Sequence, residues 1–519
     1  MPLPELIEGL LKPEAYPHDC EYIELIETHI SWVLLTGEFA YKVKKPVDLG
    51  FLDYRGLERR KFYCKEELRL NRRLAPDLYL DVATVAGPVS APRIGGPGNI
   101  LEYAVRMRQF SQQDLLPERM KTSPLDADTA RRLAHRVATF HDQVAVAPLD
   151  SPWGTPRTIL DAMEHNFSAV RENLPDPGIE ERMVPLELWT LERHAALTQE
   201  METRKTEGYI RECHGDMHLG NVAMIDGEVT LFDGIEFNPG LRWIDVISEL
   251  AFLLMDLDDR GAQQAARRVL NAYLQGTGDY GGLALLRLYQ VYRAMVRAKV
   301  SAIRASQASS DTATREHAAT QCGQYVELAD RYTRTRRPFV WITHGLSGSG
   351  KSTACSHLVE HTDAIWLRSD LERKRLFGMT PVERGQGGID EGIYSAGAGQ
   401  RVYGRLVELS RELLEAGFAV IVDATFLNGA RRHEFRELAR IYGMDFRILD
   451  LQADIETLRT RIRRRAAREA DPSDADERVL EYQLEHRDLL TRAERADVTS
   501  LDTAHLPEPG EIDRWTGGN

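Results

Sequence analysis

Hydrophobic and polar positions follow two different rhythms in the first part of the chain. Residues 22–45 alternate as paired strands do, and Thr36-Gly37-Glu38 supplies a turn between two apolar runs. Residues 57–75 carry apolar side chains at roughly helical spacing among charges. A further strand is expected at 99–105, and the sequence beyond residue 112 is mostly helical. The pattern predicts strands first and helices afterwards.

From residue 339 onward, short apolar runs alternate with helical stretches. The connector 331–338 is charged and ends in Pro338, which stops a helix, so we place a domain boundary there. Alternation of strands and helices is typical of a parallel sheet with crossover helices. The expected strands are 339–343, 364–368, 418–423 and 446–451. The whole pattern predicts an α+β part followed by a parallel α/β part, with domains at 1–105, 106–335 and 338–519.

Length, charge and cysteine content narrow the class of protein. A chain of 519 residues fits about three compact domains. No apolar run approaches the roughly 18 residues of a membrane span, and the acidic start does not read as a secretory signal. The five cysteines lack CxxC spacing, which disfavours zinc and disulfides. We therefore expect a cytoplasmic protein with no membrane partner. A net charge of −14 makes general binding of nucleic acid unlikely.

Residues 345–352, Gly-Leu-Ser-Gly-Ser-Gly-Lys-Ser, fit a phosphate loop that follows a predicted strand. The glycines let backbone N–H groups turn toward phosphates, Lys351 adds a positive charge, and Ser352 offers a hydroxyl to Mg²⁺ at a helix N-terminus. The sequence therefore predicts an ATP and Mg²⁺ site here. The nucleotide would contact Gly345, Ser347, Gly348, Ser349, Gly350, Lys351 and Ser352.

Two acids follow predicted strands in the same part of the chain. Asp370 is placed to meet an acceptor hydroxyl, although a helix N-cap is the alternative interpretation. Asp423 ends an apolar strand, as a Mg²⁺-binding acid of a phosphate-loop protein does, or it is a buried capping residue. Residues 459–468 contain six arginines, which suit either a solvated helix face or a lid that closes over ATP.

A second phosphate-transfer pattern lies near the middle of the chain. His214-x-Asp216-x-x-x-x-Asn221 has the spacing of a kinase catalytic loop, and Asp233 follows an apolar strand after the turn Asp226-Gly227. His-Gly-Asp alone would be a polar turn. With Asn221 and Asp233 both in register, we expect Asp216 to be the catalytic carboxylate and the other two to bind metal.

Several neighbouring lysines of one predicted strand could hold the nucleotide. Ala40-Tyr41-Lys42 is similar to the Ala-x-Lys of a kinase strand, so we prefer Lys42, with Lys44 on the same face as the rival. Its helix partner would be Glu67 or Glu66, and we prefer Glu67. Solvated surface charges are the alternative for that pair.

Residues 22–300, most clearly 214–233, resemble the aminoglycoside phosphotransferase and choline kinase family. The resemblance implies a two-lobed protein-kinase-like fold with Asp216 as the catalytic carboxylate and Asn221 and Asp233 as Mg²⁺ ligands. One departure is Glu27-Thr-His-Ile-Ser31, which has no glycine where a nucleotide cover would lie.

Residues 338–500 resemble small phosphate-loop kinases of the gluconate kinase, zeta toxin and polynucleotide kinase type. The likeness implies that Lys351, Ser352 and Thr353 hold nucleotide and metal, with Asp370 activating the acceptor. Arg373 and Arg432 would contact substrate or phosphate, and Arg461 and Arg465 would be lid arginines. The order of the two halves also resembles a bacterial fusion of an aminoglycoside-phosphotransferase-like domain with a P-loop kinase domain.

The sequence favours a bifunctional, Mg-ATP-dependent phosphotransferase that acts on small hydroxylated molecules such as sugars, amino-sugars or nucleoside-like compounds. Two alternatives stay open. The missing glycine cover allows a nucleotide-gated regulator with a non-catalytic kinase-like lobe. The arginine cluster allows end-phosphorylation of RNA or DNA by the second half, which would be the one nucleic-acid partner.

Overall fold

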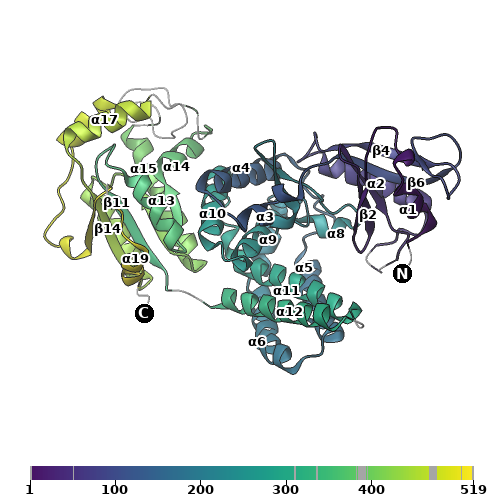
Figure 1. The fold of residues 1–519 in the computed structure, drawn as a ribbon. Coiled ribbons are helices and arrows are strands. Elements are labelled where there is room, and N and C mark those ends of the chain that lie inside the picture. The colour runs from purple at the N-terminus through teal and green to yellow at the C-terminus, as the bar shows by residue number, and fades with distance from the viewer. Residues whose placement is uncertain are drawn as a thin grey trace. The chain divides into compact units, whose positions relative to one another are not determined.

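The computed structural model describes residues 3–48, 50, 52–308, 311–334, 337–380, 383, 393, 395–466, 476–503 and 505–516. Its contacts divide the chain into two compact units (Figure 1). The first unit is Met1–Arg260 with Leu288–Glu327, and the second is Gly261–Arg287 with Leu328–Asn519. This division differs from the expected boundaries, because both predicted lobes fall in one unit and residues 261–287 join the other.

The first unit begins with a six-stranded antiparallel sheet in the order β1-β2-β3-β6-β4-β5. The expected hairpin is confirmed, since β2 and β3 pair around a turn in which Gly37 has a positive φ of 95°. Helix α2 (Leu57–Asn71) lies across β6 and β4 (Figure 1). The strands are β1 (Glu24–Glu27), β2 (Ser31–Leu35), β3 (Phe39–Lys44), β4 (Tyr79–Ala86), β5 (Arg93–Ile94) and β6 (Ile100–Arg108).

The alternation of side chains along β3 separates core from site. Tyr41 and Val43 are fully buried in an apolar cluster with Trp32 and Leu34. Successive side chains of a strand point to opposite faces, so Lys42 and Lys44 leave on the other face. There both lysines reach Glu67 of α2. Core packing on one face thus fixes two cations on the other.

The rest of the first unit is mainly helical, as the sequence predicts. Helix α9 (Val246–Asp259) is buried along nearly its whole length and lies behind the catalytic loop. The short hairpin β8/β9 and the antiparallel strand pair β7/β10 frame that loop. The helices are α1 (Glu5–Leu10), α3 (Leu116–Met120), α4 (Ala127–Gln143), α5 (Pro156–Asn173), α6 (Pro177–Ala196), α7 (Thr198–Thr206) and α8 (Pro239–Arg242). The strands are β7 (Ile210–Glu212), β8 (Val222–Ile225), β9 (Glu228–Leu231) and β10 (Trp243–Asp245).

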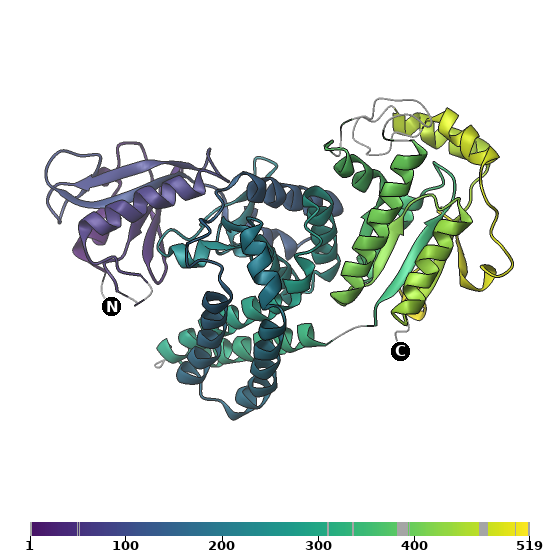
Figure 2. The ribbon, with the colours of Figure 1, turned by 180° about the vertical axis from the view of Figure 1, so that it is seen from behind.

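The second unit is built on a five-stranded parallel sheet in the order β12-β13-β11-β14-β15. Helices α13, α15 and α16 pack against it (Figure 2). The expected α/β class is confirmed, and β15 is an addition that the sequence pattern did not indicate. The strands are β11 (Phe339–His344), β12 (Ile365–Arg368), β13 (Val420–Asp423), β14 (Asp445–Leu451) and β15 (Val498–Leu501). The helices are α13 (Lys351–His361), α14 (Ser369–Leu376), α15 (Ala396–Glu415), α16 (Gly429–Ile441), α17 (Ile455–Ala466), α18 (Glu477–Glu485) and α19 (Pro509–Trp515).

Helix α10 (Gln263–Thr277) belongs to the second unit, although it precedes the predicted linker. The Asn271 side chain accepts from the Trp366 N–H at 2.7 Å and donates to the Ala364 carbonyl at 3.3 Å. Because β12 is an edge strand, this amide satisfies backbone groups that a neighbouring strand would otherwise bind. Helices α11 (Leu283–Gln307) and α12 (Thr312–Thr333) contain residues of both units.

Among the described residues, no helix combines the length and the apolar character that a membrane crossing would require.

Candidate active sites

The catalytic loop of the first unit brings Asp216 and Asn221 together, as expected. The Asn221 amide donates to Asp216 Oδ2 at 3.1 Å and to the Asp216 carbonyl at 3.0 Å. Partial burial would raise the pKa of Asp216, but His218, His214 and Arg297 outweigh it and hold that pKa below its ordinary value. Asp216 is therefore ionised at neutral pH.

Asp233 follows β9 in a strained conformation that several partners fix. Its φ is 63°, a left-handed value that few residues other than glycine adopt. Its N–H donates to the Tyr79 hydroxyl at 3.1 Å, and the N–H of Gly234 donates to the Asn71 side chain at 2.7 Å. His214, whose pKa burial lowers, donates from Nε2 to the Phe232 carbonyl at 2.8 Å. The structure thus holds the predicted metal-binding acid in one orientation.

Lys42 joins the two lobes of the first unit. Its ammonium lies 2.8 Å from Glu67 Oε1 and 2.5 Å from Asp233 Oδ1. Lys44 shares Glu67 through Oε2 at 2.6 Å and also contacts Glu236, which accepts from the Tyr54 hydroxyl. Burial would raise the pKa of Glu67, but the two lysines lower it to about 2.

These contacts distinguish the residues between which the sequence left a choice. Lys42 approaches the predicted metal-binding acid, whereas Lys44 is fully buried between two glutamates. Glu66 pairs instead with Arg69 and Arg242. Lys42 is therefore the lysine that reaches Asp233, and Glu67 rather than Glu66 is its partner on α2.

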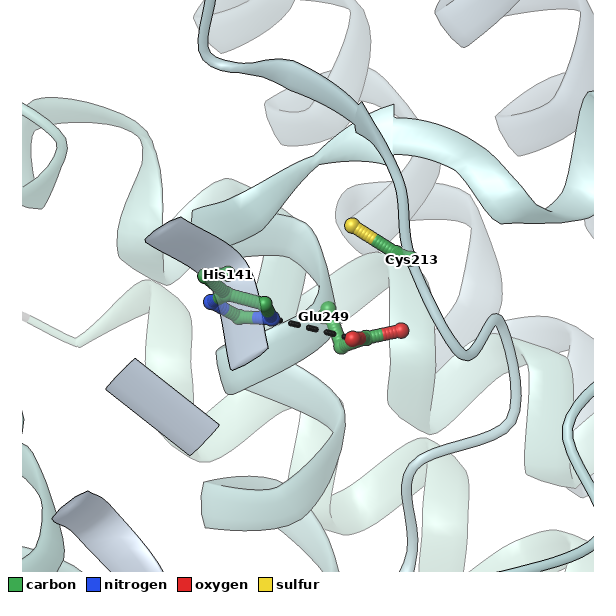
Figure 3. Close-up of side chains that lie close together, drawn as sticks. All are labelled: His141, Cys213 and Glu249. Carbon is green, nitrogen blue, oxygen red and sulfur yellow. Dashed lines mark hydrogen bonds and ion pairs between the residues drawn. The ribbon is translucent and has the colours of Figure 1, made fainter. Parts of the chain in front are cut away.

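A buried trio, His141, Cys213 and Glu249, lies directly behind the loop (Figure 3). Its potential ligand atoms lie within 4.8 Å of one another, the one such group of three among the described residues. Both Glu249 oxygens already accept hydrogen bonds, from the Gly215 N–H at 2.6 Å and from His141 Nε2 at 2.9 Å. Burial raises the pKa of Cys213 well above its ordinary value, so it stays a thiol. The trio therefore fits an anchor for Gly215 better than an ion site.

In the second unit, the phosphate loop joins β11 to α13 as the sequence predicts. A Cβ at Gly345, whose φ is 149°, would lie 2.5 Å from the Leu451 carbonyl, and one at Gly348 would lie 2.9 Å from the Leu458 carbonyl. Only glycine fits these two positions. Lys351 donates to the carbonyls of Gly345 and Leu346 at 3.0 and 2.8 Å, so its ammonium lies inside the loop. Ser349 is a buried residue of the loop itself, and Ser352 and Thr353 are exposed on the first turn of α13.

The predicted metal ligands of the second unit are adjacent. Ser352 Oγ donates to Asp423 Oδ2 at 2.7 Å, because β13 lies beside β11 in the sheet. A hydroxyl and a carboxylate at the end of a phosphate loop are oxygen ligands that suit Mg²⁺. The same Asp423 oxygen lies 3.3 Å from Trp366 Nε1 and 4.0 Å from Arg368 Nε.

Asp370 and Arg373 lie on α14, which begins directly after β12. Because Arg368 at the end of β12 is in register with Asp423, α14 starts at the same edge of the sheet. Asp370 is half-buried in the first turn, and Arg373 donates to the Ile393 carbonyl at 2.9 Å. Both predicted residues are thus brought to the edge that carries the loop.

The predicted arginines differ in their surroundings. Arg461 reaches the Gly348 carbonyl at 3.4 Å, while the side chain of Arg465 lies outside the described residues. Arg432 is only 1% exposed and donates to Glu494 at 2.6 Å and to the carbonyls of Phe426 and Asp488. Its predicted contact with substrate has no support in this geometry, because a buried guanidinium with these partners fastens residues 488–494 to α16.

Several residues of the two sites were not singled out from the sequence. Gln483 of α18 accepts from the Ser347 N–H at 2.9 Å and donates to Ser347 Oγ at 3.0 Å. Glu249 and Asp256 of α9 accept from the N–H groups of Gly215 and Leu219. The signal for α9 was present, since acids within an apolar helix require partners. Gln483 carries no such signal.

Comparison with known proteins matches the second half of the chain to a family. The AAA domain family (AAA_33) matches residues 340–490, which confirms the predicted P-loop character of the second half. An uncharacterized protein of Mycobacterium tuberculosis (strain ATCC 25618 / H37Rv) is 29% identical over 428 residues, covering 82% of this chain and 83% of the relative. A protein of Mycobacterium bovis (strain ATCC BAA-935 / AF2122/97) matches equally.

Solved structures are similar to each half. A choline/ethanolamine kinase family protein from Mesorhizobium loti covers 63% of this chain and 98% of its own, with 14% identity and a TM-score of 0.37. The amicoumacin kinase hAmiN, solved with AMP-PNP, Ca²⁺ and Ami, covers 62% and 92%, with 13% identity and a TM-score of 0.39. A gluconokinase from Sinorhizobium meliloti 1021 covers 35% and 90%, with 21% identity and a TM-score of 0.22.

Proposed function

We propose that this protein is an ATP-dependent phosphotransferase with two centres, each of which transfers the γ-phosphate to a hydroxyl group of a small molecule. Sugars, amino-sugars and nucleoside-like compounds are the acceptors we expect. The observation that carries the proposal is the Lys42 ammonium between Glu67 and Asp233 in the unit that also holds Asp216 and Asn221. Phosphoryl transfer needs this set, a nucleotide-holding cation, metal ligands and an orienting carboxylate.

In the first centre, Lys42 would bind the nucleotide phosphates, and Asp216 would orient the acceptor hydroxyl and accept its proton. Asn221 and Asp233 would hold Mg²⁺, which neutralises phosphate charge when bound. Asp233 fits this role because its side chain is 45% exposed although one oxygen contacts Lys42. Glu67 would keep Lys42 in place.

In the second centre, Lys351 and the backbone of Gly345–Gly350 would hold the phosphates of ATP. Ser352 and Asp423 would bind Mg²⁺, and their hydrogen bond supports the assignment. Asp370 would meet the acceptor hydroxyl, with Arg373 at the substrate and Arg461 as a lid residue. The free state of all five cysteines suits a reducing compartment, so we propose a cytoplasmic location.

The test uses the full chain, ATP labelled at the γ-position and a metabolite extract. We expect Asp216→Asn to abolish one set of labelled products and Asp370→Asn another. Asp226→Asn is the matched control, because Asp226 is an exposed acid of the β8/β9 turn whose positive φ asparagine also tolerates. If the two substitutions leave every product at the level of the control, the proposal is wrong.

A further inference from the structure

His218 lies between Asp216 and Asn221 in the catalytic loop, and its ring has a defined tautomer. Nδ1 accepts a hydrogen bond from the Gly220 N–H at 3.1 Å. A neutral imidazole carries one proton, so this bond places the proton on Nε2. Nε2 lies 3.4 Å from Asp216 Oδ2. The N–H of His218 therefore faces the carboxylate.

Two neighbours hold the ring in that position. Phe252 of α9 packs against it edge to face, with ring centroids 5.6 Å apart. A Cβ at Gly220 would lie 2.8 Å from His218 Cε1 and 2.9 Å from Nδ1. Gly220 has no positive φ, so the backbone does not demand glycine there. Because Gly220 has no side chain, there is space beside it for the imidazole of His218.

The position of His218 makes the surroundings of the two carboxylate oxygens of Asp216 different. Oδ2 faces two donors, His218 Nε2 and Asn221 Nδ2. Within the described part of the chain, Oδ1 has no hydrogen bond, and the Asp216 side chain is 36% exposed. One donor would leave the carboxylate free to turn about its Cβ–Cγ bond, whereas two donors from different directions fix its plane.

We propose that His218 is a positioning residue of the first centre: it holds Oδ2 of Asp216 so that Oδ1 is presented to the acceptor hydroxyl. The inference rests on the proposed function of Asp216 and adds a residue to it.

The kinetic test compares two variants of the full chain on the labelled product that depends on Asp216. His218→Leu keeps bulk but removes the donor, and we expect kcat to fall about tenfold to a hundredfold while the KM for ATP changes less than about twofold. His218→Gln keeps a donor and should recover most of kcat. Equal losses in both variants, or a matching rise in KM, would overturn the inference.

A spectroscopic test does not depend on activity. In the full chain labelled with ¹⁵N-histidine, we expect His218 to carry its proton on Nε2, with a resonance that shifts in Asp216→Asn. A proton on Nδ1 overturns the inference, whatever products are found. If instead the tautomer and shift are as expected but no Asp216-dependent product exists, the contact of His218 with Asp216 stands and the proposed function fails.

Discussion

The two centres differ in how far apart in the sequence their interacting residues lie. In the first unit, Lys42 and Asp233 are separated by 191 positions, and Glu67 is shared by two buried lysines. In the second unit, Gly345–Ser352 forms the cradle from one contiguous run, and Asp423 is brought in by the neighbouring strand. The first centre therefore depends on the packing of two lobes, whereas the second depends on local backbone geometry. Substitutions should separate these two kinds of dependence.

The largest expected effect is at Glu67. Glu67→Ala leaves two buried ammonium groups without their shared partner, so we expect it to lower the free energy of unfolding of the first unit by about 3–5 kcal/mol. Glu58→Ala on the same helix, where the side chain is 80% exposed, should change it by less than about 0.5 kcal/mol. Hydrogen exchange in β3 and α2 measures both. Equal effects would mean that the ion cluster does not hold the first centre together.

Arg432→Ala should act on the stability of the second unit rather than on substrate. It removes the partner of Glu494, and we expect a loss of about 3 kcal/mol in the free energy of unfolding. The matched control is Arg436→Ala on the same helix, whose pair with Asp497 is more exposed and worth about 1 kcal/mol or less. Unchanged stability combined with a loss of the Asp370-dependent product would restore Arg432 as a substrate contact.

The ion pair between Arg432 and Glu494 should also make the stability of the second unit depend on pH. Burial would raise the pKa of Glu494, but Arg432 and Thr491 lower it from 4.5 to about 2 in the folded protein. A depressed carboxyl pKa stabilises the fold above the unfolded value, and this contribution is lost as pH falls from about 4.5 through about 2. Glu494→Gln should flatten that part of the stability curve, measured by denaturant titration at each pH. An unchanged curve would contradict the assignment.

Lys351→Ala tests whether the second centre binds nucleotide independently of the first. Loss of a cation that contacts phosphates should weaken ATP binding at that site about a hundredfold, since a charged hydrogen bond contributes about 1.5–3 kcal/mol. Calorimetric titration of the full chain should then show one site in place of two. Ser356→Ala, on the same helix, should retain both. Two sites in Lys351→Ala would place nucleotide binding elsewhere.

Asn271→Ala tests the packing of α10, which belongs to the second unit although it precedes the predicted domain boundary. The Trp366 N–H and the Ala364 carbonyl lose a buried partner, so we expect a loss of about 2 kcal/mol in the stability of that unit.

 Asn271 itself is 4% exposed, so water cannot replace the lost bonds. Gln264→Ala, an exposed position on the same helix, is the control and should change stability by less than about 0.5 kcal/mol. Faster hydrogen exchange at β12 in Asn271→Ala alone is the expected result, and equal exchange in the two variants would contradict it.

The smallest effect is expected at Gln483. Its side-chain oxygen occupies the Ser347 N–H, a group that the phosphate loop would otherwise offer to a phosphate. Gln483→Ala should therefore tighten ATP binding at the second centre about fivefold, which corresponds to one hydrogen bond of about 1 kcal/mol. Glu481→Gln on the same helix should leave the affinity unchanged. Weaker binding in Gln483→Ala would show instead that Gln483 assists the nucleotide.

Local patterns predicted a large part of this protein. The alternation along 31–44 predicted the hairpin, and the apolar runs after residue 339 predicted four of the five parallel strands. The sequence also revealed the motif at 345–352 and the spacing of Asp216, Asn221 and Asp233. Each of these features depends on neighbouring residues in the sequence or on the end of a strand. The sequence could place Lys42 and Lys44 on one face, but it could not tell which of them meets Asp233.

The tertiary structure decided the matters that depend on contacts between distant segments. It buried Arg432 beside Glu494, turned Gln483 toward Ser347 and packed α10 on β12. Spacing along a chain fixes which residues share a face of a helix or strand, and this was enough to predict elements and motifs. Partners across elements depend instead on how the elements pack, and only the folded chain brings those charges within reach of one another.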